Sequence, residues 1–138
     1  MNKNLKEVFD EQKEFQKYFY DPDNIDIDEK VKFTKEYILS IHRELGEVLN
    51  TLPWKLHRKE DKEISIQNLN EEIIDCFKFL LNLCIIWNID HEKFVNEFFR
   101  KSMVVRQRYN QEILNTIKET DKVCAIDLDD TLAESDHH

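Results

Sequence analysis

The sequence predicts an all-α protein, and three observations favour an antiparallel four-helix bundle. Only one Gly and two Pro occur in 138 residues, which leaves few sites for the tight turns of a β-rich fold. Apolar residues recur at three- and four-residue steps over four long segments, as one face of a helix requires. Short joints between helices connect antiparallel neighbours in a bundle. We expect helices over residues 3–20, 29–50, 68–87 and 91–118.

Local signals define where these helices begin. Asp26 or Asp28 is the expected N-cap of the second helix. Asn68, with Glu71 three residues later, forms a capping-box-like pair at the start of the third helix. Asp90 follows a short corner and is the expected N-cap of the fourth helix.

The third helix is the most apolar of the four and organises the rest of the chain. In its second half apolar residues occupy several faces, so we expect this half to be buried nearly all round. Glu72 and Asp75 lie one turn apart near its start. Two carboxylates ahead of a buried segment are costly unless a cation faces them. The expected core face consists of Ile73, Ile74, Phe77, Leu80, Leu81, Cys84 and Ile85.

A second pair of acids, Glu44 and Glu47, has the same three-residue spacing on the second helix. If the two helices pack together, four carboxylates converge on one divalent cation, and Mg²⁺ prefers such oxygen ligands. A ferritin-type di-iron site needs a Glu-x-x-His on two helices, which these positions lack, so Mg²⁺ or Mn²⁺ is the expected ion. The alternative is a solvated acidic face, since 29 acids make such pairs common.

Charge and composition limit the kinds of partner. The net charge is −9, and an acidic protein repels nucleic-acid polymers and anionic membranes overall. No apolar stretch predicts a membrane span, and none at the N-terminus predicts a signal peptide. Cys76, Cys84 and Cys124 show no C-x-x-C spacing, which favours a reducing, cytoplasmic setting. A small bundle with a helix apolar on several sides favours a homodimer or a higher homo-oligomer.

The C-terminal residues differ in character from the helices. Residues 122–127 are typical of a short buried strand, and nothing after them completes a sheet. We therefore expect one all-α domain over residues 1–118, followed by a strand-like tail over residues 119–138.

The two acidic pairs and their surroundings resemble a known group, the all-α nucleoside triphosphate pyrophosphohydrolases, which includes MazG-like proteins and dimeric dUTPases. The signature of that group is E-x-x-E, a spacer and then E-x-x-D, matched here by residues 44–47 and 72–75. Asn50, Trp54 and residues 9–14 look closer to the dimeric dUTPase branch. The resemblance extends roughly over residues 5–110.

This resemblance implies a dimeric helical bundle with a Mg²⁺ site that cleaves a (d)NTP between its α and β phosphates. A pyrimidine dNTP such as dUTP or dCTP is the expected substrate, and the monophosphate and pyrophosphate are the products. Glu47 is the carboxylate expected to take a proton from the attacking water. The implied metal ligands are Glu44, Glu47, Glu72 and Asp75; Lys55, Lys101, Arg106 and Arg108 are implied to offset phosphate charge, and Gln12, Asn50 and Trp54 to contact the base.

The chain departs from the dUTPase branch at two places. Residues 15–17 follow Gln12 where an Asn is usual, and residues 101–109 replace a phosphate motif rich in Asn and Gly. Uracil specificity is therefore open, and purine or modified nucleotides are alternative substrates. A helical dimerisation or nucleotide-sensing module without catalysis is a further alternative. The basic residues then form a solvated face, and Trp54 covers the core.

Residues 123–132 resemble motif one of haloacid-dehalogenase-like phosphatases, D-x-D-x-T. Asp127 matches the nucleophile of that motif, and Asp129 matches its acid/base. Such a phosphatase needs a further Lys and an acidic pair on later strands, so we expect a truncated, inactive start of a second domain. An acidic tail with a coincidental match is the alternative.

Overall fold

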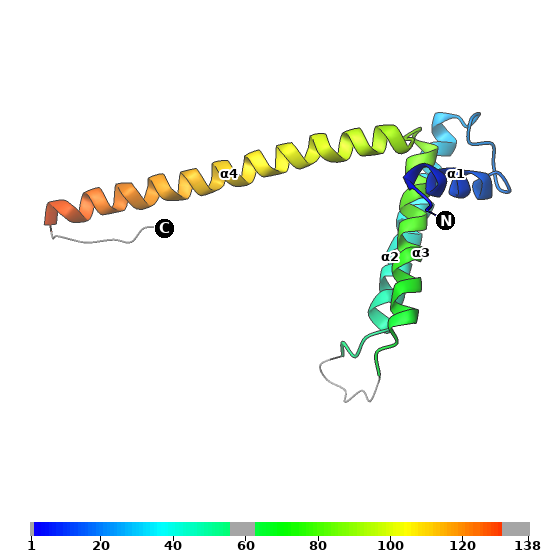
Figure 1. Cartoon of the computed structure of the whole chain (residues 1–138), viewed down its shortest axis with the longest axis horizontal. Coiled ribbons are helices and arrows are strands. Elements are labelled where there is room, and N and C mark those ends of the chain that lie inside the picture. The colour runs from blue at the N-terminus through cyan, green and yellow to red at the C-terminus, as the bar shows by residue number, and fades with distance from the viewer. Residues whose placement is uncertain (1, 56–62, 131–138) are drawn as a thin grey trace. The chain divides into compact units, whose positions relative to one another are not determined.

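The computed structural model describes residues 2–55 and 63–130, the last eight of them by backbone alone. It contains four helices: α1 (Leu5–Gln16), α2 (Ile27–Asn50), α3 (Ile66–Ile86) and α4 (His91–Asp130) (Figure 1). Over these residues there is no strand, and the predicted all-α class is confirmed. None of the described helices has the length and apolar character needed to cross a bilayer.

The chain divides into two compact units, and the boundary between them falls inside α4. The first unit spans Met1–Phe94 and contains α1, α2, α3 and the first turn of α4. The second spans Val95–His138 and contains the remainder of α4. The two predicted acidic pairs lie wholly within the first unit.

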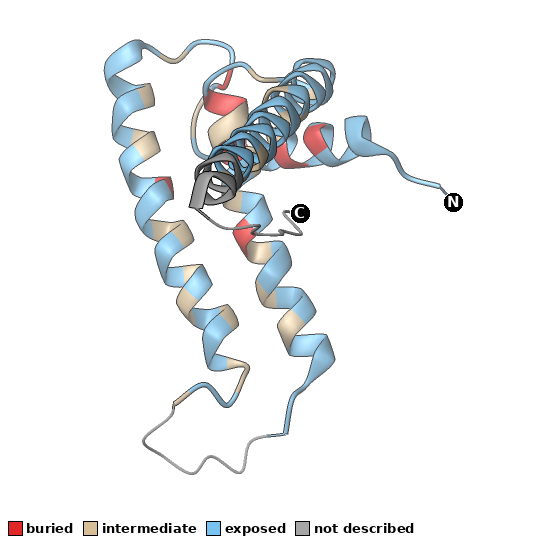
Figure 2. Cartoon of the chain, turned by 90° about the vertical axis from the view of Figure 1, so that its left-hand side faces the viewer, coloured by how far each residue is buried: buried red, intermediate tan, exposed pale blue. Residues whose placement is uncertain are grey.

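Helices α2 and α3 lie side by side and antiparallel (Figures 1 and 2). At one end of the pair, Trp87 Nε1 donates a hydrogen bond of 2.8 Å to Thr34 Oγ1. Further along, the rings of Tyr37 and Phe79 have centroids 6.1 Å apart. Residue numbers rise on one helix as they fall on the other, which fixes the antiparallel register and brings the two predicted acidic pairs to the same level.

The core of the first unit is small and contains polar as well as apolar side chains. Figure 2 shows that its few buried positions lie on α1, α2 and α3 and in the joint between α1 and α2, where Pro22 is buried. Phe9 of α1 is buried and its ring lies 5.7 Å from that of Phe94, centroid to centroid. The buried apolar residues are Phe9, Tyr37, Cys76, Ile85 and Ile86, and the buried polar residues are Gln12, Gln16 and Asn82.

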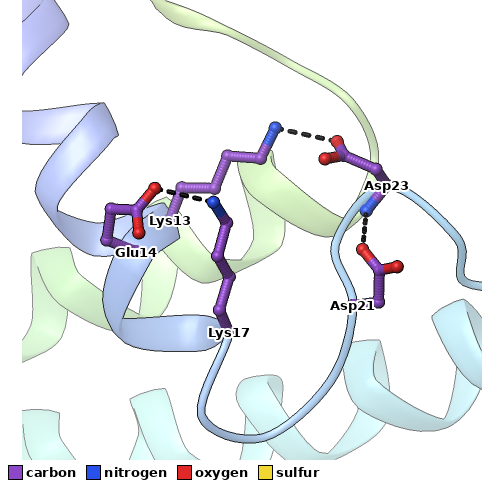
Figure 3. A network of polar contacts seen from close by, with 5 residues as sticks. All are labelled: Lys13, Glu14, Lys17, Asp21 and Asp23. Atoms are coloured by element: carbon purple, nitrogen blue, oxygen red, sulfur yellow. Dashed lines mark hydrogen bonds and ion pairs between the residues drawn. The ribbon is translucent and has the colours of Figure 1, made fainter.

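The joint between α1 and α2 is closed by a polar network on the surface (Figure 3). Lys13 Nζ reaches Asp23 Oδ1 at 2.9 Å, and the Asp23 backbone N–H donates to Asp21 Oδ1 at 3.0 Å. Lys17 Nζ pairs with Glu14 Oε1 at 2.7 Å. Because these groups are exposed, each pair adds little stability, but together they define the path of the chain as it leaves α1.

The helix N-termini confirm two of the three predicted caps. The side chains of Asp26 and Asp90 each accept a backbone N–H hydrogen bond of 2.8 Å at the starts of α2 and α4. At α3 the prediction was wrong, because the N-cap is Ser65, whose Oγ accepts from the backbone N–H of Asn68 at 3.3 Å. A hydroxyl three residues earlier caps the N–H groups of the preceding turn, so α3 gains most of a turn.

The C-terminus of α3 is a Schellman motif built on an asparagine. Asn88 has a φ of 58°, in the left-handed region. The backbone N–H of Ile89 donates to the carbonyl of Cys84 at 2.8 Å, and that of Asn88 donates to the carbonyl of Ile85 at 3.2 Å. This motif forms the short corner predicted between the third and fourth helices.

Only part of the apolar stripe predicted to form the core is buried in the packing of α3 against α1 and α2: Ile85 is buried, and Leu81 and Cys84 are half-buried. Phe79 and Asn82 make the contacts to α2 and α1. Residues 81–86 are all buried or half-buried, so the expected burial on every side holds only for this last part. Because α3 is apolar on several faces, periodicity alone did not select the packed one. Four predicted core residues are 37–57% exposed: Ile73, Ile74, Phe77 and Leu80.

The predicted strand over residues 122–127 was wrong, because α4 is helical through Asp130. A lone strand leaves its backbone N–H and C=O groups unpaired, whereas a helix pairs them within the segment. Among the residues that the structure describes there is no second strand to pair with. Asp127 and Asp129 therefore lie on helical backbone, and their side chains are outside the description. The domain boundary at residue 118 remains a prediction.

Candidate active site

A cavity of about 540 Å³ opens between α1, α2 and α3. On α3 its lining residues follow the spacing i, i+3, i+4, i+7, so that one face of the helix runs along the whole cavity. An acidic group stands at one end of this face and an amide at the other. The lining consists of Gln12, Phe15, Gln16 and Phe19 from α1 and its end, Phe33, Glu36, Tyr37 and Glu44 from α2, and Asp75, Lys78, Phe79 and Asn82 from α3.

Three carboxylates from two helices meet at the acidic end. Each of Glu44, Glu72 and Asp75 offers an oxygen, and these oxygens all lie within 4.8 Å of one another. Burial, followed by the negative charges of Asp75 and Glu44, raises the pKa of Glu72. The three groups therefore repel one another when ionised, and a hard divalent cation, which prefers carboxylate oxygens, fits this donor set.

The fourth predicted acid, Glu47, lies outside this group. It is exposed, while its charge is close enough to contribute to the raised pKa of Glu72. The structure thus brings together three of the four predicted metal ligands. Sequence reasoning missed Arg43, whose guanidinium lies 3.2 Å from Glu44 Oε1, and Lys78, which lines the cavity one turn after Asp75.

The opposite end of the cavity is formed by buried amides. Gln12 and Asn82 are 7% and 4% exposed, and Gln12 Nε2 donates to Asn82 Oδ1 at 2.8 Å. Gln16 is 3% exposed, and its Oε1 accepts a hydrogen bond of 3.1 Å from the Tyr37 hydroxyl. The sequence singled out Gln12 but not Asn82, although an amide inside the most apolar run of the chain was a signal for it.

An aromatic wall supports these amides from the α2 side. The ring of Phe33 lies 4.8 Å from that of Tyr20 and 5.9 Å from that of Tyr37, centroid to centroid. Burial raises the pKa of both tyrosines, so both hydroxyls keep their protons at neutral pH. The Tyr37 hydroxyl donates its hydrogen bond to Gln16 Oε1, whereas the buried Tyr20 hydroxyl has no hydrogen-bond partner among the described residues.

Several residues predicted for the site are not brought to the cavity. Trp54 Nε1 donates to Asn50 Oδ1 at 3.4 Å, and Lys55 Nζ lies 5.9 Å from the centroid of the Trp54 ring. These residues gather at and just beyond the C-terminus of α2, and the described lining of the cavity includes none of them. Lys101, Arg106 and Arg108 lie on the part of α4 that belongs to the second unit.

The sequence matches one protein-family model, described as dUTPase, over residues 4–134. No curated protein and no solved structure shows a significant match. The family match covers nearly the whole chain, including the paired acids of α2 and α3 and the amides of the cavity. The chain therefore belongs to the dUTPase family, within the all-α group that also contains the MazG-like proteins.

Proposed function

We propose that the chain is a divalent-metal-dependent pyrophosphohydrolase that converts dUTP to dUMP and pyrophosphate. The observation that carries this proposal is a single cavity with clustered carboxylates at one end and buried amides at the other. A nucleotide has the matching polarity, since its phosphates need a metal and its base needs hydrogen-bonding groups. Membership of the dUTPase family supports the assignment of uracil as a base.

At the acidic end, Glu44, Glu72 and Asp75 would hold Mg²⁺, or Mn²⁺ in its place. A bound ion of this kind neutralises triphosphate oxygens and lowers the pKa of a coordinated water. The chain supplies further charge through Lys78, which lines the same cavity. The earlier candidates for phosphate contact, Lys55, Lys101, Arg106 and Arg108, remain proposals.

The reaction balances without any further reactant. The oxygen of a water molecule forms a bond to the α-phosphorus, and the bond from that phosphorus to the bridging oxygen breaks. Pyrophosphate leaves with the electron pair of the broken bond. Glu47, exposed beside the three clustered acids, accepts the proton that the water gives up, as a general base does.

A homodimer or a higher homo-oligomer is part of this proposal. The apolar stripe of α3 that does not face α2 is exposed in the single chain, as a subunit contact would require. Beside it, a groove of about 530 Å³ between α1 and α3 continues the apolar surface. The groove is lined in part by Val8, Phe15, Ile74, Phe77 and Leu81.

The test is pyrophosphate release from a panel of dNTPs and NTPs, with Mg²⁺ and with EDTA. We expect metal-dependent release led by dUTP, and we expect Glu47→Gln to lower kcat by at least about 100-fold, the usual range for a general base. Glu29→Gln, an exposed change at the other end of α2, is the matched control and should retain activity.

The other outcomes separate the alternatives. Release led by a purine or a modified nucleotide would keep the chemistry and remove the uracil assignment. No release from any nucleotide, with folded protein and metal present, would overturn the enzyme and leave a helical dimerisation or nucleotide-sensing module. Equal activity of Glu47→Gln and wild type would remove Glu47 from the mechanism.

A further inference from the structure

The three clustered acids have one cationic partner in the described part of the chain, Arg43 of α2. Its guanidinium lies 3.2 Å from Glu44 Oε1, and no other ion pair there involves Glu44, Glu72 or Asp75. The clustered oxygens all lie within 4.8 Å of one another, so three carboxylates compete for any positive charge near them. Arg43 thus supplies to this group a part of the positive charge that the proposed function assigns to a divalent cation.

The partner of Arg43 is not the one that helix geometry favours. Side chains at i and i+4 are neighbours on a helix, whereas those at i and i+1 point in different directions. The i+4 residue is Glu47, an exposed acid of α2. Arg43 nevertheless pairs with the next residue, Glu44, which lines the cavity. This pairing indicates that the negative charge of the cluster draws the guanidinium toward the acidic end of the cavity.

The two ends of this ion pair differ in exposure. The Arg43 side chain is 67% exposed, whereas that of Glu44 is 14% exposed. An exposed arginine loses little stability when it leaves such a pair, since water solvates the released guanidinium. A carboxylate that is mostly removed from water is costly without a positive partner. Glu44 therefore needs a cation, whereas Arg43 can leave once another cation has arrived.

A guanidinium that leaves Glu44 lies beside the phosphates of a bound nucleotide. Mg²⁺ holds its oxygen ligands at about 2.0–2.1 Å and commonly binds carboxylates and substrate phosphates together. A phosphate oxygen on an ion held by Glu44 is therefore a near neighbour of that carboxylate, which Arg43 already contacts. The planar fork of N–H donors on an arginine matches phosphate as well as it matches carboxylate. One side chain can thus serve both states of the site.

We propose that Arg43 is a phosphate-binding residue that pairs with Glu44 while the site holds no ion and moves to the triphosphate when metal and nucleotide bind. This inference rests on the proposed function, because it needs the metal site and the nucleotide assigned there. The exchange includes no covalent step. One ion pair replaces another, and the bound ion takes the place of the guanidinium at Glu44.

This exchange gives Arg43 opposite effects on two binding steps. Without nucleotide, Arg43 competes with a divalent ion for Glu44 and repels that ion, so its removal should tighten ion binding. With nucleotide present, Arg43 contacts phosphate, so its removal should weaken nucleotide binding. An arginine without a role in the site predicts neither effect, and an arginine that only holds Glu44 in place for the ion predicts weaker ion binding.

The sizes of the two effects follow from charge. Two unit charges about 4 Å apart in water change an equilibrium by about fivefold, and a divalent ion doubles their interaction. Because Arg43 moves away as the ion binds, we expect a smaller change, with Arg43→Gln lowering the Kd for Mn²⁺ by about threefold or more. Charge-assisted hydrogen bonds to phosphate are the stronger ones, so the same variant should raise the Kd for nucleotide by about tenfold or more.

The experiment measures the two binding steps separately. Mn²⁺ alone is titrated by calorimetry and by the electron paramagnetic resonance signal of the unbound ion, at low and at high salt. High salt should reduce the difference between the variant and the wild type, because it screens exposed charges. A second titration, with saturating Mg²⁺, uses a dUTP analogue with an imido bridge between the α and β phosphates. Inorganic triphosphate, which lacks the base, tests the phosphate contact independently of base preference.

Two further variants are the controls. Lys32→Gln removes an exposed positive charge from α2 about 16 Å along the axis from Arg43, and it should change neither Kd. Arg43→Lys keeps the charge but loses the fork, so we expect wild-type affinity for Mn²⁺ and intermediate affinity for nucleotide. Circular dichroism and the Tm without metal verify that each variant is folded. If Arg43→Gln fails to fold, the loss of nucleotide affinity in Arg43→Lys still tests the contact.

The outcomes separate this inference from the proposed function. Tighter binding of Mn²⁺ together with weaker binding of nucleotide in Arg43→Gln is the expected result. An unchanged or weaker affinity for Mn²⁺, or an unchanged affinity for both phosphate probes, would overturn the exchange, while turnover of nucleotide by the wild type would keep the proposed function. A wild type that binds no Mn²⁺ and hydrolyses no nucleotide would overturn both.

Discussion

Apolar replacements of Gln12 and Asn82, made singly and together, measure how far these amides depend on each other. Gln12→Met and Asn82→Leu keep the approximate length and shape of the side chains while removing the hydrogen bond of 2.8 Å. Each single replacement leaves one buried amide without its protein partner. The double replacement leaves no amide at this position.

The magnitudes follow from burial and from the cavity. A net hydrogen bond contributes about 1 kcal/mol, and an orphaned buried amide costs about 1–3 kcal/mol. Because both residues line a cavity that admits water, hydration reduces the second cost, and we expect each single variant to lose about 1 kcal/mol of unfolding free energy. The double variant should lie close to the wild type, which gives a coupling energy of about 1–2 kcal/mol.

Equilibrium unfolding in urea, at constant protein concentration, gives the four free energies of the cycle. For a chain of this size, about 1 kcal/mol corresponds to a change in Tm of about 4 °C, so thermal unfolding provides an independent check. Additive losses, with the double variant less stable by the sum of the singles, would show that the amides do not stabilise each other. The double variant should also lose its preference among bases while remaining folded, since the pair would then serve recognition rather than stability.

Three further predictions concern the clustered acids, the interior of α2 and the C-terminus of α3. The raised pKa of Glu72 means that ionising this group costs folded-state stability as pH rises through that pKa, so the Tm gain from added Mg²⁺ should be larger at pH 8 than at pH 5, and a larger gain at pH 5 would contradict the metal site. Gly46→Ala should raise the free energy of unfolding by about 0.5–1 kcal/mol in a urea titration, because Gly46 is inside α2 and an added Cβ meets no atom within 4 Å; a loss would refute the reasoning. Asn88→Gly should match or exceed wild-type stability while Asn88→Val should lose about 1–2 kcal/mol, since a β-branched residue does not tolerate φ near 58°; equal stability of the two variants by calorimetry would exclude this explanation.

The helices and the acidic end of the site could be predicted because their signals are local. Apolar spacing defined α2 and α3 to within two residues at each end. Acids at i and i+3 on one helix share a face whatever the tertiary structure, and an antiparallel neighbour with a second pair brings the two sets to one level. The clustering of Glu44, Glu72 and Asp75 could be predicted from this geometry. The position of Glu47 outside the cluster could not, because it depends on side-chain conformations that spacing does not determine.

The packed face of α3 could not be predicted from hydrophobicity. A helix that is apolar on several sides gives nearly the same pattern whether a given side meets its own chain or another surface. Asn82 was overlooked for this reason, because it lies on the packed face between Leu81, a residue of the expected core, and Leu83. A polar residue inside an apolar run is better evidence for a site than one more apolar residue is for a core.

The amide end of the cavity and the C-terminal tail depended on non-local structure. Gln16 and Tyr37 come together only because α1 and α2 both border the cavity, and their separation along the chain gives no hint of it. Residues 122–127 contain Val and Ile, which favour strands, but propensity yields when a long helix precedes the segment and no strand among the described residues can pair with it.

The face of α3 that lines the cavity also fixes the distance between the acidic end and the amide end. Asp75 and Asn82 are seven residues apart, and the helical rise holds them about 10 Å from each other along the axis. Under the proposed function, substitutions at the amide end would change which base is accepted without moving the carboxylates assigned to the phosphates. An insertion between the two residues would rotate one end by about 100° relative to the other and separate recognition from chemistry. Proteins built on such a helix can change their substrates through single substitutions at one end. The number of helical residues between the two ends then stays constant.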